Sequence, residues 1–217
     1  PVLEDADVTI GVVQGVLGIR WFDCTVTGME AHAGPTPMAL RKDAMQVSAR
    51  IMQEVVACAM RHQPHGRGTV GMVQVFPNSR NVIPGRVKFS IDLRNATDAL
   101  VDQMADEVKA FAAKVAKDSG LDVKIEMVSS YPAQAFHSDC VDAVGRAARK
   151  LGYSNMPAVS GAGHDAVYMA KLAPAGMIFI PCKDGISHNE IEDAKPEHIT
   201  AGCNVLLHAM LERAKVV

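Results

Sequence analysis

The sequence predicts an α/β protein built around a β-α-β-β-α-β block. Three observations lead to this prediction. Residues 86–94 alternate apolar and polar side chains, as a strand with one buried face does. Residues 47–58 and 100–115 carry apolar side chains at helical spacing. Residues 121–127 alternate again, directly after a glycine that is expected to end the second helix.

The first strand and the first helix are predicted within residues 19–68. The strand begins at Ile19, and its apolar side chains occupy every second position: Phe22, Cys24 and Val26. A loop rich in glycine and proline follows over residues 28–38. Asp43 and Gln46 resemble a capping box, so a helix is expected to begin there. Its apolar stripe is Val47, Ile51, Val55 and Cys58. The helix is expected to end near residues 64–68.

The second half of the block contains the clearest strand in the chain. Residues 69–76 are β-rich, and residues 77–85 form a loop. The strand over 86–94 has one apolar face: Val87, Phe89, Ile91 and Leu93. Thr97 is expected to cap a helix that Gly120 ends. The stripe of that helix is Leu100, Met104, Val108, Phe111 and Val115. The last strand alternates Leu121, Val123, Ile125 and Met127. This order is ferredoxin-like, with one antiparallel sheet and two helices on one face.

The remaining residues predict a second α/β region. Residues 1–18 are apolar and show no clear period. A helix is expected over 138–151, a short strand over 156–159, and another helix after the glycine-rich residues 160–166. Met177–Pro181 is a continuous apolar run, which predicts a strand buried on both faces of a larger parallel sheet. Pro196 is expected to open a final helix that reaches about Lys215.

Composition excludes several functional classes. The formal net charge is −2 and aromatic residues make up 5%, so neither a basic field nor a stacking surface for nucleic acid is expected. Cysteines number five and form no C-x-x-C pair, which predicts free thiols in the reducing cytoplasm. No apolar run approaches the ~20 residues that span a bilayer, and no signal peptide is expected.

Three histidines are singled out by their surroundings. His32 lies in the loop A-H-A-G-P-T-P, His164 follows S-G-A-G before a predicted helix, and His188 follows the apolar run. Each can contact a ligand there, but each can equally be an ordinary loop or turn residue. By contrast, His62 and His65 lie in polar sequence at a helix end and are interpreted as solvated.

Two further polar residues are candidates for binding an anionic ligand. Arg94 ends the polar face of a strand, and its guanidinium group can hold a carboxylate with two parallel hydrogen bonds. Asn81 precedes V-I-P-G. The alternatives are a solvated arginine and a turn asparagine.

The motifs taken together are more specific than any one of them. In order they are G-x-x-A-H-A-G-x-T-P-M, N-V-I-P-G, D-L-R, S-G-A-G-H-D-A and I-S-H-N-E. This series resembles the amidase/hydantoinase–carbamoylase family of the di-metal aminopeptidase-like superfamily. The family includes N-carbamoyl-L-amino-acid hydrolases, β-ureidopropionases and allantoate amidohydrolases.

The resemblance implies a catalytic α/β domain interrupted by an inserted lid domain that also dimerises. Residues 19–131 would be the lid, and residues 1–18 and 132–217 would be segments of the catalytic domain. The family fold implies two divalent metal ions, which could be Zn, Mn, Co or Ni. It also implies a small carboxylate as substrate and a homodimer formed through the lid.

The resemblance also implies roles for individual residues. His188 would be a metal ligand. The candidate catalytic residues are His32, which would polarise the scissile carbonyl, often in the partner subunit's site, and His164. Asn81 and Arg94 would bind the substrate carboxylate. The loop that lines the substrate would consist of Gly161, Ala162 and Gly163, next to His164.

The chain departs from the family pattern at its beginning. Family members carry an H-x-D segment, a Glu-Glu pair and an H-I-E-Q-G motif earlier in the chain, whereas residues 1–18 contain no histidine. The sequence is therefore expected to be the C-terminal half of such an enzyme, with an incomplete metal site and no activity alone. Alternatives are an allantoate or β-ureidopropionate amidohydrolase and an inactive ferredoxin-like dimerisation or ligand-binding module. Apolar surface around Met177–Ile180 is expected to favour association.

Overall fold

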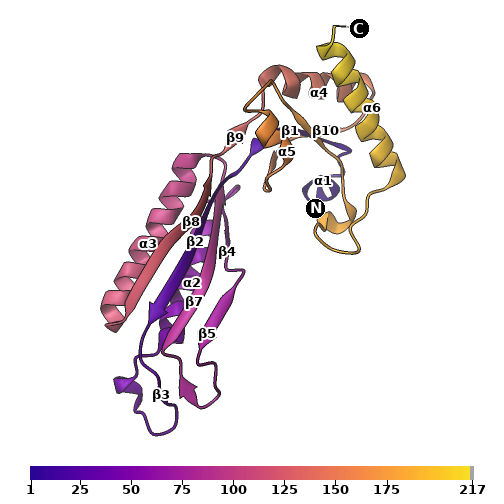
Figure 1. The fold of residues 1–217 in the computed structure, drawn as a ribbon. Coiled ribbons are helices and arrows are strands. Elements are labelled where there is room, and N and C mark those ends of the chain that lie inside the picture. Colours follow the sequence, from indigo (N-terminus) through magenta and orange to yellow (C-terminus); the bar gives the residue numbers. More distant parts are fainter. Residues whose placement is uncertain (216–217) are drawn as a thin grey trace. The chain divides into compact units, whose positions relative to one another are not determined.

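The computed structural model describes residues 1–215, which form two compact units (Figure 1). The inserted unit comprises Leu17–Ala133. The split unit comprises Pro1–Val16 and the chain from Gln134 onward. Each unit has its own hydrophobic core, so each is described separately.

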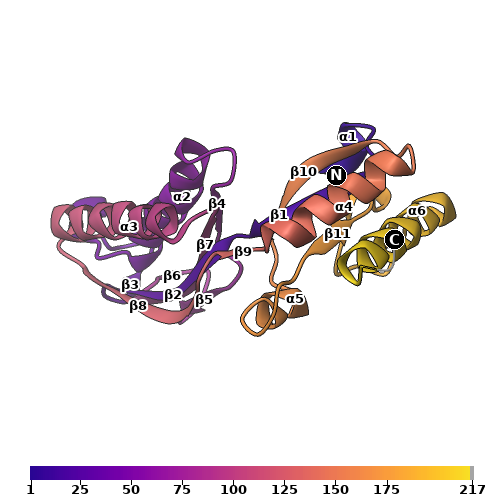
Figure 2. The same ribbon diagram turned by 90° about the horizontal axis from the view of Figure 1, so that it is seen from above.

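The inserted unit contains one antiparallel sheet with two helices on one face (Figure 2). The sheet order is β4-β7-β2-β8, and β5 also pairs with β7. The strands are β2 (Gly18–Thr27), β4 (Arg67–Thr69), β5 (Val73–Phe76), β7 (Arg86–Asn95) and β8 (Asp122–Tyr131). The helices are α2 (Ala44–Arg61) and α3 (Asp98–Ser119). The ferredoxin-like arrangement predicted from the sequence is confirmed.

The core of this unit forms where the apolar faces of β2 and β7 meet the two helices. Cys24 of β2 and Phe89 of β7 are paired in register and fully buried. The predicted stripe of α2 is buried throughout. One prediction is wrong: Leu100 is exposed, because the buried stripe of α3 begins at Val101. The last predicted strand is confirmed as β8, although Met127 is exposed beside a register shift.

One charged residue points into this core. Arg20 lies two residues before Phe22, on the same face of β2, and its side chain is only 7% exposed. Its Nη2 contacts Asp98 at 3.1 Å, and its Nε contacts Asp102 at 2.8 Å. Nη1 donates hydrogen bonds to the carbonyls of Ile19 and Tyr131. The guanidinium group thus joins β2 to the first two turns of α3 and to the end of β8.

Both helices of the inserted unit begin at a side-chain cap. The carboxylate of Asp43 accepts hydrogen bonds from the backbone N–H groups of Met45 and Gln46. Thr97 accepts from Leu100, and Gly120 ends α3 in the left-handed region at φ 66°.

We expect Asp43→Ala to lower the free energy of unfolding by about 1 kcal/mol, because two N–H groups of the first turn of α2 lose their acceptor. Urea denaturation followed by circular dichroism measures the change. Asp43→Asn is the matched control, since its side-chain oxygen can still accept. An equal loss in both variants would contradict this explanation.

The split unit is organised around β1 (Ile10–Val16). β1 pairs in parallel with β10 (Asn155–Ser160) and antiparallel with β11 (Met177–Phe179) and β9 (Gln134–Ala135). The other elements are the helices α1 (Val2–Asp5), α4 (Ser138–Lys150), α5 (Asp165–Met169) and α6 (Pro196–Arg213). The prediction that 177–181 is a parallel strand buried on both faces is wrong. β11 is short, antiparallel to β1 and half-buried.

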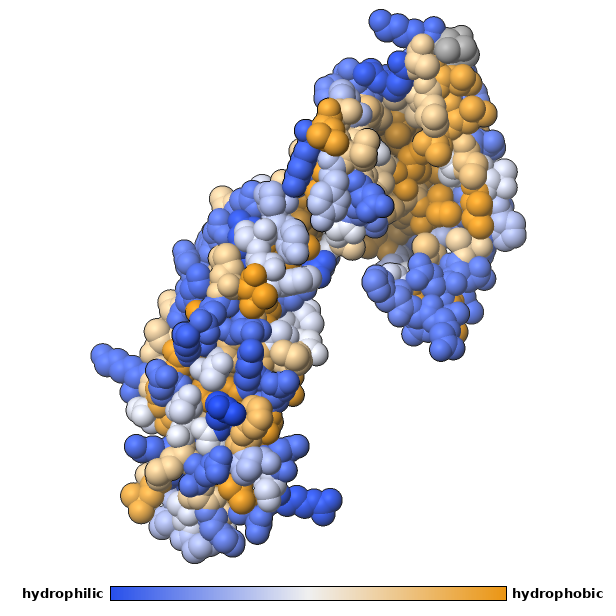
Figure 3. All heavy atoms as spheres, viewed as in Figure 1, coloured by the Kyte–Doolittle hydropathy of each residue, from blue (hydrophilic) through white to orange (hydrophobic). Residues whose placement is uncertain are grey.

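An apolar groove opens on one side of the split unit. It encloses about 550 Å³ and is bordered by α4, β11 and α6. Met177, Ile180 and Leu206 line it, and the space-filling view shows hydrophobic side chains in the hollow beside α6 (Figure 3). The apolar surface expected around Met177–Ile180 therefore lies in this groove; its association with other molecules stays a prediction. Over residues 1–215, no helix has both the length and the hydrophobicity needed to cross a bilayer.

Candidate functional site

Two of the candidate residues meet at one end of the inserted unit. The short strand β3 (Ala31–His32) pairs antiparallel with β6 (Val82–Ile83). The backbone N–H of Ala33 donates to the carbonyl of Asn81 over 2.8 Å, so His32 and Asn81 lie on adjoining segments. Nδ1 of the exposed His32 accepts a hydrogen bond of 3.0 Å from the N–H of Gly34. A neutral imidazole therefore carries its proton on Nε2, which can donate to a ligand.

Arg94 lies at the other end of the same unit. It pairs in register with Ile19 and Arg67, next to the last residue of β7. β3 and β6 lie beyond the opposite end of β7, where Gly28 and Gly85 join the two loops through a backbone hydrogen bond. Arg86 begins β7, and Arg94 lies eight positions further along the strand, which corresponds to about 27 Å. The inserted unit therefore does not bring Arg94 together with His32 and Asn81.

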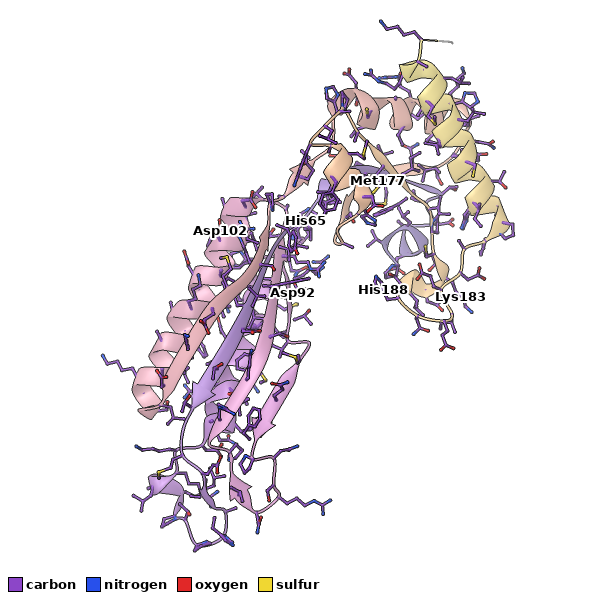
Figure 4. All side chains as sticks on the ribbon, viewed as in Figure 1. His65, Asp92, Asp102, Met177, Lys183 and His188 are labelled. Atoms are coloured by element: carbon purple, nitrogen blue, oxygen red, sulfur yellow. The ribbon has the colours of Figure 1, made fainter. Side chains whose placement is uncertain are left out.

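The guanidinium group of Arg94 is held by a neighbour on the same face of the strand. Nε and Nη2 donate to the carboxylate of Asp92, over 3.0 Å and 2.6 Å. These hydrogen bonds raise the pKa of Arg94 above its ordinary value, so the group is charged at every accessible pH. Figure 4 labels Asp92 on the sheet. Asp92 fixes the orientation of a permanent cation that is about three-quarters buried.

His164 and the glycine-rich loop lie together in the split unit. His164 is the residue before α5, and its Nε2 lies 2.9 Å from the Oγ of the buried Ser160. Ser160 also donates to the carbonyl of Ala162, so its hydroxyl oxygen is the acceptor for a proton on Nε2 of His164. The ring of Phe179 contacts the imidazole edge to face. Gly161, Ala162 and Gly163 are exposed. The loop therefore offers an oriented imidazole and accessible backbone.

His188 lies in an exposed loop that follows β11 (Figure 4). Its backbone adopts a left-handed conformation at φ 58°, and its N–H donates to the carboxylate of Glu192 over 3.0 Å. Over residues 1–215, His188 belongs to no group of three potential metal ligands. A two-metal centre needs several carboxylates and imidazoles. The described residues therefore do not form such a centre, although His188 can supply one ligand to it.

Sequence reasoning missed a cluster between the two helices of the inserted unit. Cys58, His62 and Glu107 place a sulfur, a nitrogen and a carboxylate oxygen within 4.8 Å of one another. The interpretation of His62 as solvated is wrong, because its side chain is only 11% exposed and its Nε2 lies 2.9 Å from Glu107. The available signal was the spacing of Cys58 and His62, because residues four apart at the end of a predicted helix tend to share one face.

Comparison with known proteins places these features in a family. The model of Peptidase family M20/M25/M40 matches residues 4–212. The N-carbamoyl-L-amino-acid amidohydrolase of Rhizobium meliloti is 46% identical over 217 residues, covering 100% of this chain and 52% of the relative. The allantoate amidohydrolase of Bacillus subtilis is 31% identical over 212 residues, covering 98% and 52%.

A solved structure gives the same result. The crystal structure of an amidase of the hydantoinase/carbamoylase family from Burkholderia multivorans superposes with a TM-score of 0.95 at 53% identity, covering 99% of this chain and 52% of that one. The chain thus spans about half the length of the relatives that it matches. The resemblance inferred from the motifs is confirmed, and the chain belongs to the peptidase family M20/M25/M40.

Proposed function

We propose that the protein hydrolyses the carbamoyl C–N bond of N-carbamoyl-L-amino acids, as a complete enzyme of which this chain forms about half. The observation that carries the proposal is the 46% identity to an N-carbamoyl-L-amino-acid amidohydrolase over all 217 residues. One substrate molecule and one water would give the free L-amino acid, carbon dioxide and ammonia.

Arg94 is the proposed anchor of the substrate carboxylate. It is permanently charged, its plane is held by Asp92, and a guanidinium group matches the geometry of a carboxylate. Asn81 of the subunit that supplies His32 would add an amide hydrogen bond. Anchoring the substrate at a remote charge contributes to the rate by positioning the scissile bond.

His32 is the proposed donor to the scissile carbonyl. Because Gly34 occupies its Nδ1, Nε2 is available to stabilise the negative charge that develops on the carbonyl oxygen. Ser160 orients His164 in the same way, and His164 with the loop 161–163 would line the substrate.

The separation of these residues supports a homodimer in which subunits share their sites. The carboxylate and the carbamoyl group of one substrate are a few bonds apart, whereas about 27 Å of strand separates the two ends of the inserted unit. Arg94 of one subunit and His32 of another would therefore serve the same substrate. We place the contact between subunits in the inserted unit.

The metal dependence of the complete enzyme also belongs to this proposal. His188 would supply one imidazole to a centre of two divalent ions, which would provide Lewis-acid activation of water. The candidate ions are Zn, Mn, Co or Ni, as the family resemblance implies. A cytoplasmic location fits the five free cysteines of the chain.

A second candidate is hydrolysis of allantoate, or of β-ureidopropionate. The 31% identity to the allantoate amidohydrolase of Bacillus subtilis favours the first of these. The remaining alternative is an inactive dimerisation or ligand-binding module, which the ferredoxin-like inserted unit would suit.

The test compares these substrates with the longer protein that contains this chain. We expect release of free amino acid from N-carbamoyl-L-amino acids to have a higher kcat/KM than ammonia release from allantoate or β-ureidopropionate. N-carbamoyl-D-amino acids are the control for stereospecificity. Faster turnover of allantoate would favour the second candidate, and no turnover of any substrate by the metal-loaded protein would favour the inactive module.

A further inference from the structure

We propose that the inserted unit binds one zinc-type divalent cation between α2 and α3, through Cys58, His62 and Glu107. These three residues have no role in the proposed hydrolysis. The site would therefore be a property of the inserted unit alone.

The positions of the three side chains follow from helix geometry. Cys58 lies in the last turn of α2 and His62 is the residue that follows the helix, so their side chains come from the same end of α2. Glu107 projects from the middle of α3, which packs against α2. The ligands thus come from both sides of a helix–helix contact, and a bound ion would join the two helices.

The distances fit a small tetrahedral ion. A carboxylate oxygen and a thiolate sulfur on one tetrahedral zinc lie about 3.5 Å apart, and an oxygen and an imidazole nitrogen about 3.3 Å. Cys58 Sγ lies 3.6 Å from Oε2 of Glu107. His62 Nε2 lies 2.9 Å from the other oxygen, Oε1, so the carboxylate must turn to place one oxygen beside both donors. The three ligand atoms already lie within 4.8 Å of one another.

The donor types and charges also select the ion. A sulfur, an imidazole nitrogen and a carboxylate oxygen form a zinc-type set rather than a calcium or magnesium set. A thiolate and a carboxylate would neutralise the charge of a divalent ion.

Without the ion the same groups are satisfied within the protein. The thiol of Cys58 donates to the carbonyl of Met104, and Arg61 donates to Glu107. Arg61 also contacts Glu54, so it retains an acidic partner when Glu107 turns to a metal. The thiol proton leaves on binding. Three protein ligands leave the fourth position to water, and the partly exposed Glu107 gives solvent access.

The test titrates the 217-residue chain with Co²⁺, a spectroscopic substitute for zinc. We expect one equivalent to bind with the near-ultraviolet charge-transfer band of a cobalt–thiolate bond, and Zn²⁺ to displace it. Cys58→Ser should abolish the band. His62→Gln should abolish binding of that one equivalent, and it changes a residue outside the hydrophobic core of the unit.

The matched controls are Cys203→Ser and His65→Gln, since Cys203 is exposed and His65 lies in the loop after α2. Both should retain the band. Circular dichroism establishes that each variant is folded, and Zn²⁺ should raise the Tm of the wild type and of His65→Gln but not of His62→Gln. The proposal is overturned if the wild type shows no thiolate band, or if the band survives Cys58→Ser, or if His62→Gln binds as tightly as His65→Gln.

Discussion

An equal mixture of Arg94→Ala and His32→Ala chains should recover about a quarter of the wild-type activity of the complete enzyme. If each substrate contacts Arg94 of one subunit and His32 of the other, a mixed dimer contains one site with both residues and one site with neither. Half of the dimers formed by random exchange are mixed, and each has one of its two sites intact. The separate variants should both be nearly inactive.

The measurement is kcat/KM after the two variants are unfolded together and refolded. Arg94→Ala alone should lower kcat/KM by about two orders of magnitude, the loss expected for a hydrogen-bonded charge pair. Arg94→Lys is the control: it keeps the positive charge but cannot form two parallel hydrogen bonds to a carboxylate. It should therefore recover only part of that loss. Activity of the mixture no higher than that of the separate variants would show that each site is built within one subunit.

Removing both acidic partners of Arg20 should destabilise the chain by about 3 kcal/mol. In the Asp98→Asn, Asp102→Asn double variant, the buried guanidinium group keeps its charge and loses both counter-charges. Arg20→Met should cost less, because Asp98 and Asp102 are each about half exposed and water can solvate them. The order of these two effects distinguishes a buried cation from an ordinary surface ion pair.

Urea denaturation of the 217-residue chain measures both effects. Asp106→Asn is the control, since Asp106 is 82% exposed on α3, and its effect should stay within about 0.5 kcal/mol. If Arg20→Met is the more destabilising variant, packing of the arginine stem outweighs the burial of its charge.

The inserted unit could be predicted from the sequence because its strands and helices each have one buried face. Phe89 and Val55, for example, were expected to be apolar core positions from the strand and helix periods, and both are buried in the core. β1 was not predicted, because it is central in its sheet and nearly every residue from Ile10 to Val16 is buried. A strand buried on both faces shows no alternation. The sequence of β1 also does not show that β11 runs antiparallel beside β1.

The candidate site was predictable only where its geometry is local. Asp92 and Arg94 are two residues apart on one strand, so their contact could have been inferred from the alternation. The pairing of His32 with the segment after Asn81 depends on two loops separated by about fifty residues of chain, and no periodicity encodes it. The contact of His62 with Glu107 depends on how the two helices pack against each other. The sequence predicts that both helices cover one face of the sheet, but not which of their side chains meet.

The way in which the chain enters and leaves the inserted unit affects the order of folding. Val16 and Gln134 are paired neighbours on β1 and β9, so the split unit can form its central ladder only after residues 17–133 have closed a loop. Closing an unfolded loop of that length costs about 4 kcal/mol of chain entropy. A folded inserted unit has already brought its own ends together, since Ile19 pairs with Tyr131. We therefore expect the inserted unit to fold first. Its two ends then hold the two parts of the split unit close together, so that they can pair.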